Sequence, residues 1–478
     1  MRPISILACL ACSLGAAAQG LPDLGSTGDA VLSPQIERRI GESIVREIRF
    51  REPSYLDDPE IAEYLGGIGE RISREMPGTR HDFEFFVLRD PTLNAFALPG
   101  GFMGVHTGLI AAAETESELA SVIAHELAHV TQRHIARMLG KQEEMSLPVL
   151  AALAAAVLLG RARPDLAAGA AAAAQAGAVQ ATLAYSREFE RDADRVGFGA
   201  LEQAGFDPRA MAVFFERLQR AMRVADDGSV PGYLRTHPVT VERIADVQNK
   251  AAALPYRQHP DSVEFHLVRA KLRAQAGDAR DAIAHFESAV RDRRYASEAA
   301  ARYGFALALL RARRAGEAQT QLRLARAAGA AGPMVEAADA RARQAQGDAA
   351  GAAALLEKAR SRYPRSRALV YSQVTVLQDA RRHAEALGVL ESEVREHPRD
   401  PRLRTLQARS HAELGQRFQQ HQAQAEVYAL QGSLPAAIEQ LEIARRAGGA
   451  DFYQLSVVDA RLKELRAQHA QEVREAKR

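Results

Sequence analysis

The sequence predicts a mainly α-helical chain in two parts: an α+β domain with a small β-sheet, followed by an all-α repeat solenoid. Strand-like residues gather only between Asp82 and Ile110, and a repeating Ala-, Leu- and Arg-rich helical pattern begins at Asp261. The 478 residues are too many for one hydrophobic core. The net charge of +2 gives no reason to expect nucleic acid as a partner.

The N-terminus has the pattern of a signal peptide over residues 1–18. Arg2 supplies a positive start, the run ISILACLACSLG is apolar but too short to span a bilayer, and small residues follow up to a cleavage position after Ala18. Both cysteines, Cys9 and Cys12, lie in this segment, so the mature chain would have neither thiol nor disulfide. We therefore expect an exported, periplasmic protein.

Residues 33–255 are expected to form the first domain. Pro34 and Pro59 each suit the first position of a helix. The aromatic and β-branched run from Asp82 to Leu88 predicts a strand, and the sheet is expected to continue through a turn at Pro99, Gly100 and Gly101. His106 is expected on an edge strand, with a packing role.

The stretch SVIAHELAHVTQRH is rich in helix-forming residues and contains His125, Glu126 and His129. Residues four apart share a helix face, so the two histidines point the same way, as in zinc peptidases. A catalytic zinc ion usually takes three protein ligands. His134 would lie on the opposite face of a continuous helix, so we expect it to be a structural or surface residue.

The third ligand is then expected from the acidic helix YSREFERDADRVG, residues 185–197. Spacing alone leaves two pairs open, because the members of each pair are one helical turn apart. These pairs are Glu188 with Asp192 and Glu190 with Asp194.

The motif around His125, together with SREFERDADRVG, resembles the HtpX-type and CAAX-prenyl-protease-type zinc metallopeptidases. NAFALPGG before the motif and RTHPVTVERI after it are also similar to family elements. The resemblance covers about residues 33–253 and implies a gluzincin-like α+β domain. It implies one Zn²⁺ ion, held by His125, His129 and Glu190.

The same resemblance implies the roles of the neighbouring residues. Zinc would polarise the scissile carbonyl and acidify a water molecule, and Glu126 would take the proton. Asp194, one turn beyond Glu190, can accept a hydrogen bond from a zinc histidine. Gly197, on the same face, would let the two helices approach closely.

His237 stands in a Thr-His-Pro loop just before a helix. In periplasmic relatives the corresponding histidine lies close to the metal. We expect it to act as a gate, as a fourth zinc ligand in a closed state. An oxyanion donor in an open state and a plain loop residue are the alternatives.

The apolar stretch from Ser146 to Gly160 and the Ala-rich run to Ala181 are interrupted by Arg161, Arg163 and Asp165. The apolar core is shorter than the roughly 20 residues needed to cross a bilayer. We expect a helical hairpin over the active-site cleft, with peripheral contact to a membrane surface as the alternative.

Residues 260–478 repeat. One register of small residues has spacings of 36, 34, 34 and 51 residues, the last equal to one repeat plus an extra helix. Small or β-branched residues recur twelve positions earlier and large ones four positions later, which predicts degenerate tetratricopeptide repeats, with a generic helical bundle as the alternative. The register residues are Ala282, Ala318, Ala352, Ala386 and Ala437, preceded by Ala270, Ala306, Ala340, Val374 and Ala425 and followed by Phe286, Leu322, Leu356, Leu390 and Leu441.

A signal peptide, a zinc peptidase and C-terminal repeats in this order resemble the periplasmic β-barrel assembly-enhancing proteases. The resemblance implies an exported zinc endopeptidase that degrades misfolded or stalled outer-membrane proteins and assists their assembly. Its repeats would dock on the barrel assembly machinery. The alternative is a chaperone or adaptor whose protease is latent and self-plugged. We expect a chain lacking residues 261–478 to retain a zinc-binding domain.

Overall fold

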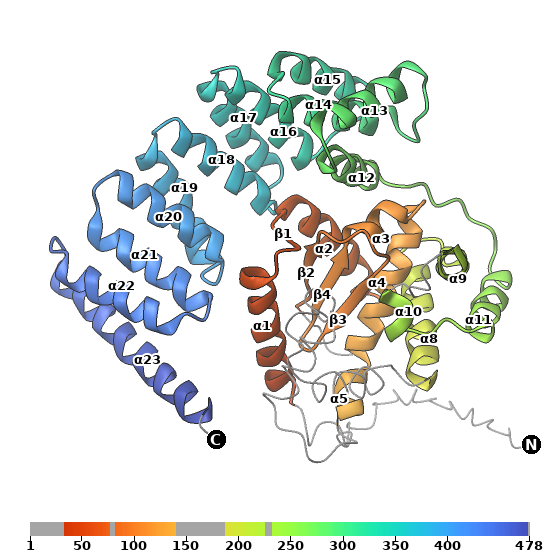
Figure 1. The fold of residues 1–478 in the computed structure, drawn as a ribbon, viewed down its shortest axis with the longest axis horizontal. Helices are drawn as coiled ribbons and strands as arrows, with labels where there is room; N and C mark the ends of the chain where they lie inside the picture. Colours follow the sequence, from red (N-terminus) through yellow and green to blue (C-terminus); the bar gives the residue numbers. More distant parts are fainter. Residues whose placement is uncertain (1–32, 77–81, 140–186, 225–231, 477–478) are drawn as a thin grey trace, which may run out of the picture.

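The structure, a computed structural model, describes residues 33–76, 82–139, 187–224 and 232–476. The elements up to α11 form one body around a small sheet, and helices α12 to α23 form an arc that curves over that body and down one side (Figure 1). The expected signal peptide, 1–18, and hairpin, 146–181, lie outside the described residues. Within those described ranges, no helix combines the length and apolarity that a bilayer span requires.

The first two helices begin where the prolines predict. Helix α1 (Pro34–Arg51) has Ser33 as N-cap, whose Oγ accepts a hydrogen bond from the Ile36 amide, 3.3 Å away. Helix α2 (Pro59–Ser73) is capped by the Asp58 carboxylate, which accepts from the amides of Glu60 and Ile61. Proline at the first helical position costs no hydrogen bond, because that amide has no partner within the helix.

Four strands form the sheet in the order β1-β2-β4-β3. Strand β4 pairs parallel with β2 and antiparallel with β3, and β1 pairs antiparallel with β2. The expectation that His106 lies on an edge strand is wrong, because the turn at Gly100 and Gly101 folds β4 back between β2 and β3 and leaves β3 at the edge. The strands are β1 (Tyr55–Leu56), β2 (Glu84–Leu88), β3 (Ala95–Leu98) and β4 (Phe102–His106).

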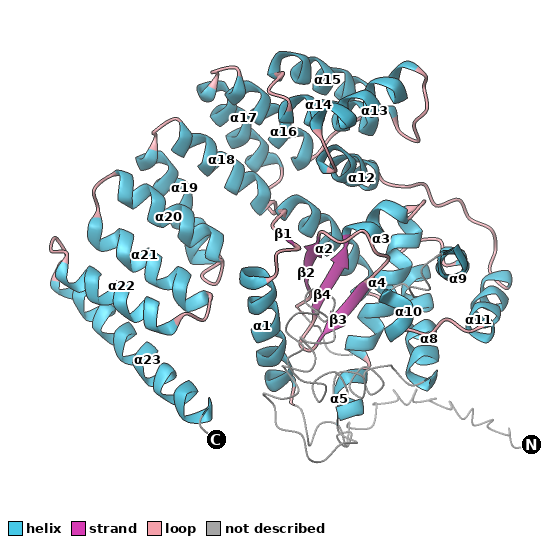
Figure 2. Ribbon diagram, viewed as in Figure 1, coloured by secondary structure: helices cyan, strands magenta, loops and turns pink. Residues whose placement is uncertain are grey.

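The sheet is buried on both faces, and its residues alternate between two hydrophobic clusters. Phe85, Val87 and Met103 face the cluster that includes α2 and the motif helix, whereas Phe86 and Phe102 face α1. Successive side chains of a strand point to opposite faces, so the apolar runs of the sequence fill both layers. The motif helix lies along one face of the sheet (Figure 2).

Among the remaining helices of this body, the motif helix lies against the sheet, and later helices pack on the motif helix and on one another (Figures 1 and 2). Thr115 caps the motif helix, α4, by accepting from the Glu118 amide at 3.2 Å. The helices are α3 (Thr107–Ala112), α4 (Glu116–Thr131), α5 (His134–Leu139), α8 (Arg187–Gln203), α9 (Arg209–Val224), α10 (Gly232–Thr236) and α11 (Val241–Ala252).

The second half is a solenoid of helices, as predicted. The small residues of the register are buried in the second helix of each pair, and the expected extra helix is α20, which lies between Ala386 and Ala437. In chain order, the solenoid begins with α12 (Val263–Gln275), α13 (Ala279–Arg291), α14 (Glu298–Arg311), α15 (Ala315–Ala327), α16 (Pro333–Ala345) and α17 (Ala349–Arg362). They are followed by α18 (Arg367–Asp379), α19 (His383–Glu396), α20 (Pro401–Glu413), α21 (Arg417–Leu430), α22 (Leu434–Arg446) and α23 (Phe452–Ala476).

The solenoid joins the first body through a shared hydrophobic core at α12. One cluster of buried residues runs without interruption from Leu65 of α2 to Phe265 of α12 and Tyr303 of α14. Lys271 of α12 is buried there and its Nζ donates to Asp58, 2.7 Å away. The two halves are therefore separate in sequence pattern but continuous in packing.

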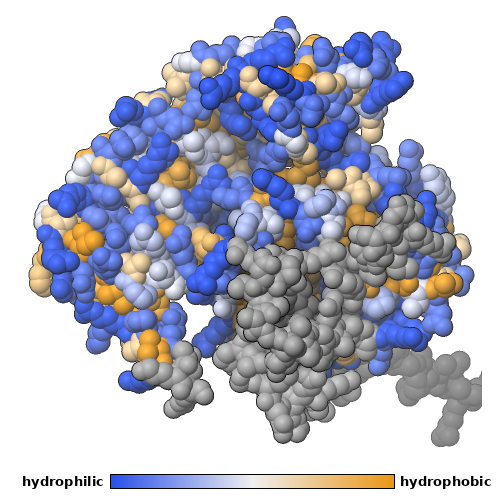
Figure 3. Space-filling model, viewed as in Figure 1, coloured by the Kyte–Doolittle hydropathy of each residue, from blue (hydrophilic) through white to orange (hydrophobic). Residues whose placement is uncertain are grey.

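Farther along the arc, the contacts between the halves are polar and more exposed. Arg365 and Arg399, each following a proline at equivalent positions of adjacent repeats, pair with Glu70 and Glu42 at 2.7 and 2.9 Å. The face of the solenoid visible in Figure 3 is largely hydrophilic, with hydrophobic residues in small separate groups. The arc is thus anchored by apolar packing at α12 and by ion pairs at its later turns.

Candidate metal centre

The centre is built where α4 and α8 cross at close range. A Cβ on Gly197 of α8 would lie 3.1 Å from the carbonyl carbon and oxygen of Ala124 in α4, which is tighter than most Cβ contacts. Glycine at this position therefore permits the close approach, and the α8 residues one and two turns earlier, Asp194 and Glu190, face His125 and His129.

Nitrogen and oxygen atoms of four buried residues converge. The Nε2 atoms of His125 and His129 lie 3.0 Å apart, and Glu190 oxygens lie 3.5 and 3.4 Å from them. His237 joins from the loop after α10, with Nδ1 3.0 Å from Glu190 and 3.3 Å from His125 Nε2. One ligand atom from each of the four residues lies within 4.8 Å of the other three.

Glu126 lies beside this cluster. Its Oε2 accepts a hydrogen bond from the Ala97 amide of edge strand β3 at 3.1 Å. Its Oε1 makes no hydrogen bond within the described part of the chain and lies 3.4 Å from His237 Nε2. Burial raises the pKa of Glu126 above its ordinary value, which makes this carboxylate a stronger base than an exposed glutamate.

Asp194 holds His125 and is itself held by Arg243 of α11. The carboxylate lies 3.0 Å from His125 Nδ1 and accepts two hydrogen bonds from the Arg243 guanidinium, at 2.7 and 2.8 Å. Burial alone would raise the pKa of Asp194, but Arg243 and His125 lower it. An ionised carboxylate only accepts, so it keeps hydrogen on Nδ1 of His125 and leaves Nε2 as the nitrogen that can bind a metal ion.

The charges of the cluster favour a cation. Burial would lower the pKa of His125, yet Asp194 and Glu190 raise it to about 9. Burial would also raise the pKa of Glu190, but His237, His125 and His129 hold it well below its ordinary value. Two imidazole Nε2 atoms that face each other at 3.0 Å need a proton or a metal ion near them. Imidazole nitrogen and carboxylate oxygen are also the ligand types that zinc accepts.

The structure brings the sequence-predicted residues His125, Glu126, His129, Glu190, Asp194 and His237 into one buried site. Of the carboxylates in the two pairs that spacing left open, Glu190 faces the cluster while Glu188 is exposed.

Two contributors, Arg243 and Tyr233, were missed by the sequence reasoning, and His134, expected to be a structural or surface residue, lies against His129. Tyr233 is fully buried and stacks on His237 with ring centroids 4.6 Å apart. His134 is fully buried with Nδ1 2.9 Å from His129 Nδ1. Tyr233 and Arg243 are, respectively, four residues before and six residues after His237, so the loop that carries His237 was the available signal.

Comparison with known proteins agrees with this arrangement. Residues 59–251 match peptidase family M48, and residues 344–410 match a tetratricopeptide repeat family. The chain is 30% identical to the β-barrel assembly-enhancing protease of Yersinia pestis over 95% of this chain and 94% of that one. It is also 30% identical to the Escherichia coli K12 protein of that name, over 94% of this chain and 92% of that one.

A putative β-barrel assembly-enhancing protease of Vibrio cholerae is 39% identical, over 53% of this chain and 52% of its own length. Identity therefore extends through both halves in the first two relatives and over about half of each chain in the third. The chain belongs to peptidase family M48, as a metalloendopeptidase of the β-barrel assembly-enhancing protease group with C-terminal tetratricopeptide repeats.

Proposed function

We propose that His125, His129 and Glu190 hold one zinc ion and that His237 is a fourth protein ligand in the closed state of the enzyme. The observation that carries this proposal is the convergence of four buried ligand atoms within 4.8 Å. A catalytic zinc site usually keeps one position open for water, so a site with four protein ligands is closed to substrate. In this state the chain is a latent protease.

When bound, zinc supplies a Lewis acid that polarises a peptide carbonyl and lowers the pKa of a water molecule. The chain's own residues do the rest. Glu126 takes a proton from water and returns it to the leaving amine. Asp194 fixes the tautomer of His125, and the backbone of edge strand β3, whose Ala97 amide binds Glu126, lies beside the reacting groups.

His237 occupies the space between the base and the ligands. Its Nε2 faces Glu126 at 3.4 Å and its Nδ1 faces Glu190 at 3.0 Å. A substrate carbonyl must approach both groups, so the imidazole must move before a peptide can bind. Tyr233 stacks on its ring and Pro238 follows it in the chain, which makes the closed position well packed.

The proposed cellular role is that of an exported endopeptidase that degrades misfolded or stalled outer-membrane proteins and assists their assembly in the periplasm. It is supported by relatives of similar length whose name states barrel assembly. The repeats would bind the barrel assembly machinery, because solenoids provide extended binding surfaces and no chemistry. The alternative is an adaptor with a latent protease, which the closed arrangement of His237 favours.

The first test of the site is metal content. The purified protein is expected to carry about one zinc ion per chain, and His125→Ala, His129→Ala and Glu190→Ala are each expected to lose most of it. Glu188→Ala is the matched control, because Glu188 is exposed on the same helix. Zinc is measured by elemental analysis after dialysis. Full zinc in Glu190→Ala with loss in Glu188→Ala would contradict the ligand assignment.

The gate is tested by His237→Ala, with cleavage of casein and of an unfolded outer-membrane barrel protein as the two assays. If His237 mainly closes the site, its removal is expected to increase cleavage of both substrates. If it mainly donates to the oxyanion, turnover is expected to fall by on the order of 10²–10³-fold. We expect the increase. Wild-type rates on both substrates would remove His237 from the active site.

A further inference from the structure

His129 contacts a second histidine, His134, outside the ligand cluster, and His134 in turn contacts a carboxylate. His134 Nδ1 lies 2.9 Å from His129 Nδ1, on the side of the ring opposite the cluster. The other nitrogen of His134, Nε2, lies 3.3 Å from Asp192 Oδ2. A chain of polar contacts therefore runs from His129 through His134 to Asp192 of α8.

The chain turns sharply to place His134 there. Helix α4 ends at Thr131, and Arg133 has a positive φ of 52°, so His134 begins a new helix, α5, rather than continuing the old one. Arg133 is held by Glu37 of α1, with its NH2 nitrogen 2.7 Å from the carboxylate. Phe189 stacks on the His134 ring with centroids 4.6 Å apart. This turn is the reason why a continuous-helix argument put His134 on the wrong face.

The positions of the hydrogen atoms along this series of polar contacts assign a tautomer to each ring. Two facing Nδ1 atoms share one hydrogen atom. Asp192 accepts from His134 Nε2–H, so a neutral His134 has its lone pair on Nδ1 and accepts from His129 Nδ1–H. The remaining nitrogen of His129, Nε2, then presents its lone pair to His125 and Glu190, as a metal ligand must.

We propose that His134 and Asp192 are positioning residues that fix the tautomer and orientation of His129, as Asp194 does for His125. This inference rests on the proposed zinc function. The acidic helix would then supply three carboxylates with separate tasks: Glu190 as ligand, Asp194 as the direct partner of His125, and Asp192 as the partner of His129 through His134. Asp192 lies two residues from each of the other two and so on a different face of α8, and it contacts His134 rather than His129 itself.

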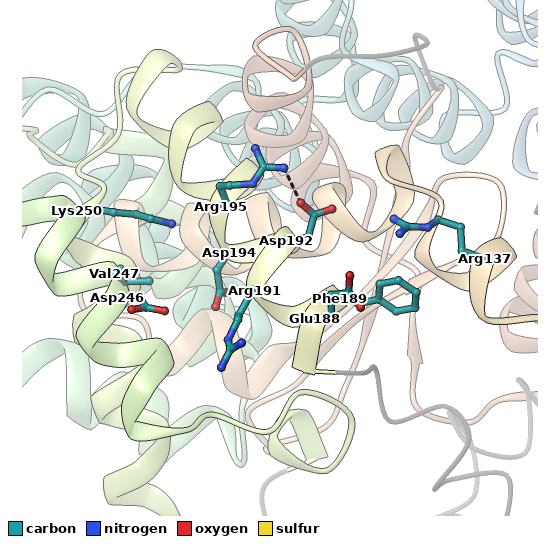
Figure 4. Close-up of a pocket in the computed structure, with 10 residues that line it drawn as sticks. All are labelled: Arg137, Glu188, Phe189, Arg191, Asp192, Asp194, Arg195, Asp246, Val247 and Lys250. Carbon is teal, nitrogen blue, oxygen red and sulfur yellow. Dashed lines mark hydrogen bonds and ion pairs between the residues drawn. The ribbon is translucent and has the colours of Figure 1, made fainter. Parts of the chain in front are cut away.

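Asp192 differs from Asp194 in exposure. It is half-buried, and at the surface cavity of about 430 Å³ that both aspartates line, its carboxylate pairs with Arg195 at 2.6 Å (Figure 4). Asp194 is buried and clamped by Arg243. Asp192 can therefore be replaced without leaving a buried charge unpaired, which makes it a cleaner test than Asp194.

The experiment measures zinc affinity by chelator competition and the visible absorption spectrum of the Co²⁺-substituted protein. His134→Leu removes the acceptor and is expected to weaken zinc binding by on the order of 10–100-fold and to change the cobalt spectrum. His134→Gln restores an acceptor oxygen and is expected to recover most of the affinity. Asp192→Ala is expected to weaken binding less than His134→Leu, because the imidazole remains.

Arg195→Ala, which removes the exposed partner of Asp192, and Glu188→Ala are the controls, and both are expected to bind zinc as wild type does. Circular dichroism of the metal-free proteins checks folding. The inference is overturned if folded His134→Leu keeps wild-type affinity and spectrum, or if His134→Gln is as weak as His134→Leu. If His134→Leu does not fold, unchanged binding in Asp192→Ala overturns it. A wild-type protein without zinc would instead overturn the proposed function.

Discussion

Replacing Glu126 by glutamine is expected to abolish measurable proteolysis while leaving the fold and the bound zinc in place. Loss of a general base costs about 10²–10⁴-fold in rate. In the wild type, Glu126 Oε2 accepts a hydrogen bond from the Ala97 amide. The glutamine oxygen can accept the same hydrogen bond, so β3 and α4 keep their contact.

The measurement is the initial rate of casein cleavage, with zinc content determined on the same sample. Glu188→Gln is the matched control: it makes the same chemical change on an exposed carboxylate of α8 and is expected to cleave as wild type does. Turnover near wild type in Glu126→Gln would remove Glu126 as the base. Loss of zinc from this variant would show instead that Glu126 is needed to hold the metal.

Much of the fold was predictable because it depends on local patterns. The prolines at positions 34 and 59 mark helix starts through a constraint on one backbone amide, and the small residues of the repeats mark helix contacts through their spacing. The order of the strands was not predictable in this way. Placing β4 inside the sheet depends on its parallel pairing with β2, which no single stretch of sequence encodes.

The same division holds for the site. His125 and His129 could be paired from spacing alone, since both are on one helix. His134 could not, because its position depends on the left-handed conformation of Arg133, a residue type that rarely adopts it. Arg243 and Tyr233 could not be identified either, because the folding of α10 and α11 against α8 decides what they contact.

The second large effect is expected from Lys271→Met, at the junction of the two halves. Lys271 of α12 is buried and contacts Asp58 and Glu60 of α2, and Asp58 also caps α2. Burial alone would lower the pKa of Lys271, but these two carboxylates raise it, so the lysine is charged. Removing the cation leaves two carboxylates without their counter-charge, one of them buried, which costs about 3–5 kcal/mol in the free energy of unfolding.

Arg365→Met is the control, because Arg365 pairs with Glu70 across the same interface but is exposed, and such a pair contributes no more than about 1 kcal/mol. Urea unfolding of both variants and the wild type is followed by far-ultraviolet circular dichroism and by release of zinc. We expect Lys271→Met to lower the urea midpoint of both signals in one shared transition, because the hydrophobic cluster continues from α2 into α12 and α14.

For the same reason we expect a chain cut at residue 260 to have a less stable zinc-binding half, contrary to the independence that the sequence pattern suggests. A zinc-release midpoint that Lys271→Met leaves unchanged, together with an equally stable truncated chain, would show that the catalytic half does not depend on the repeats for its core.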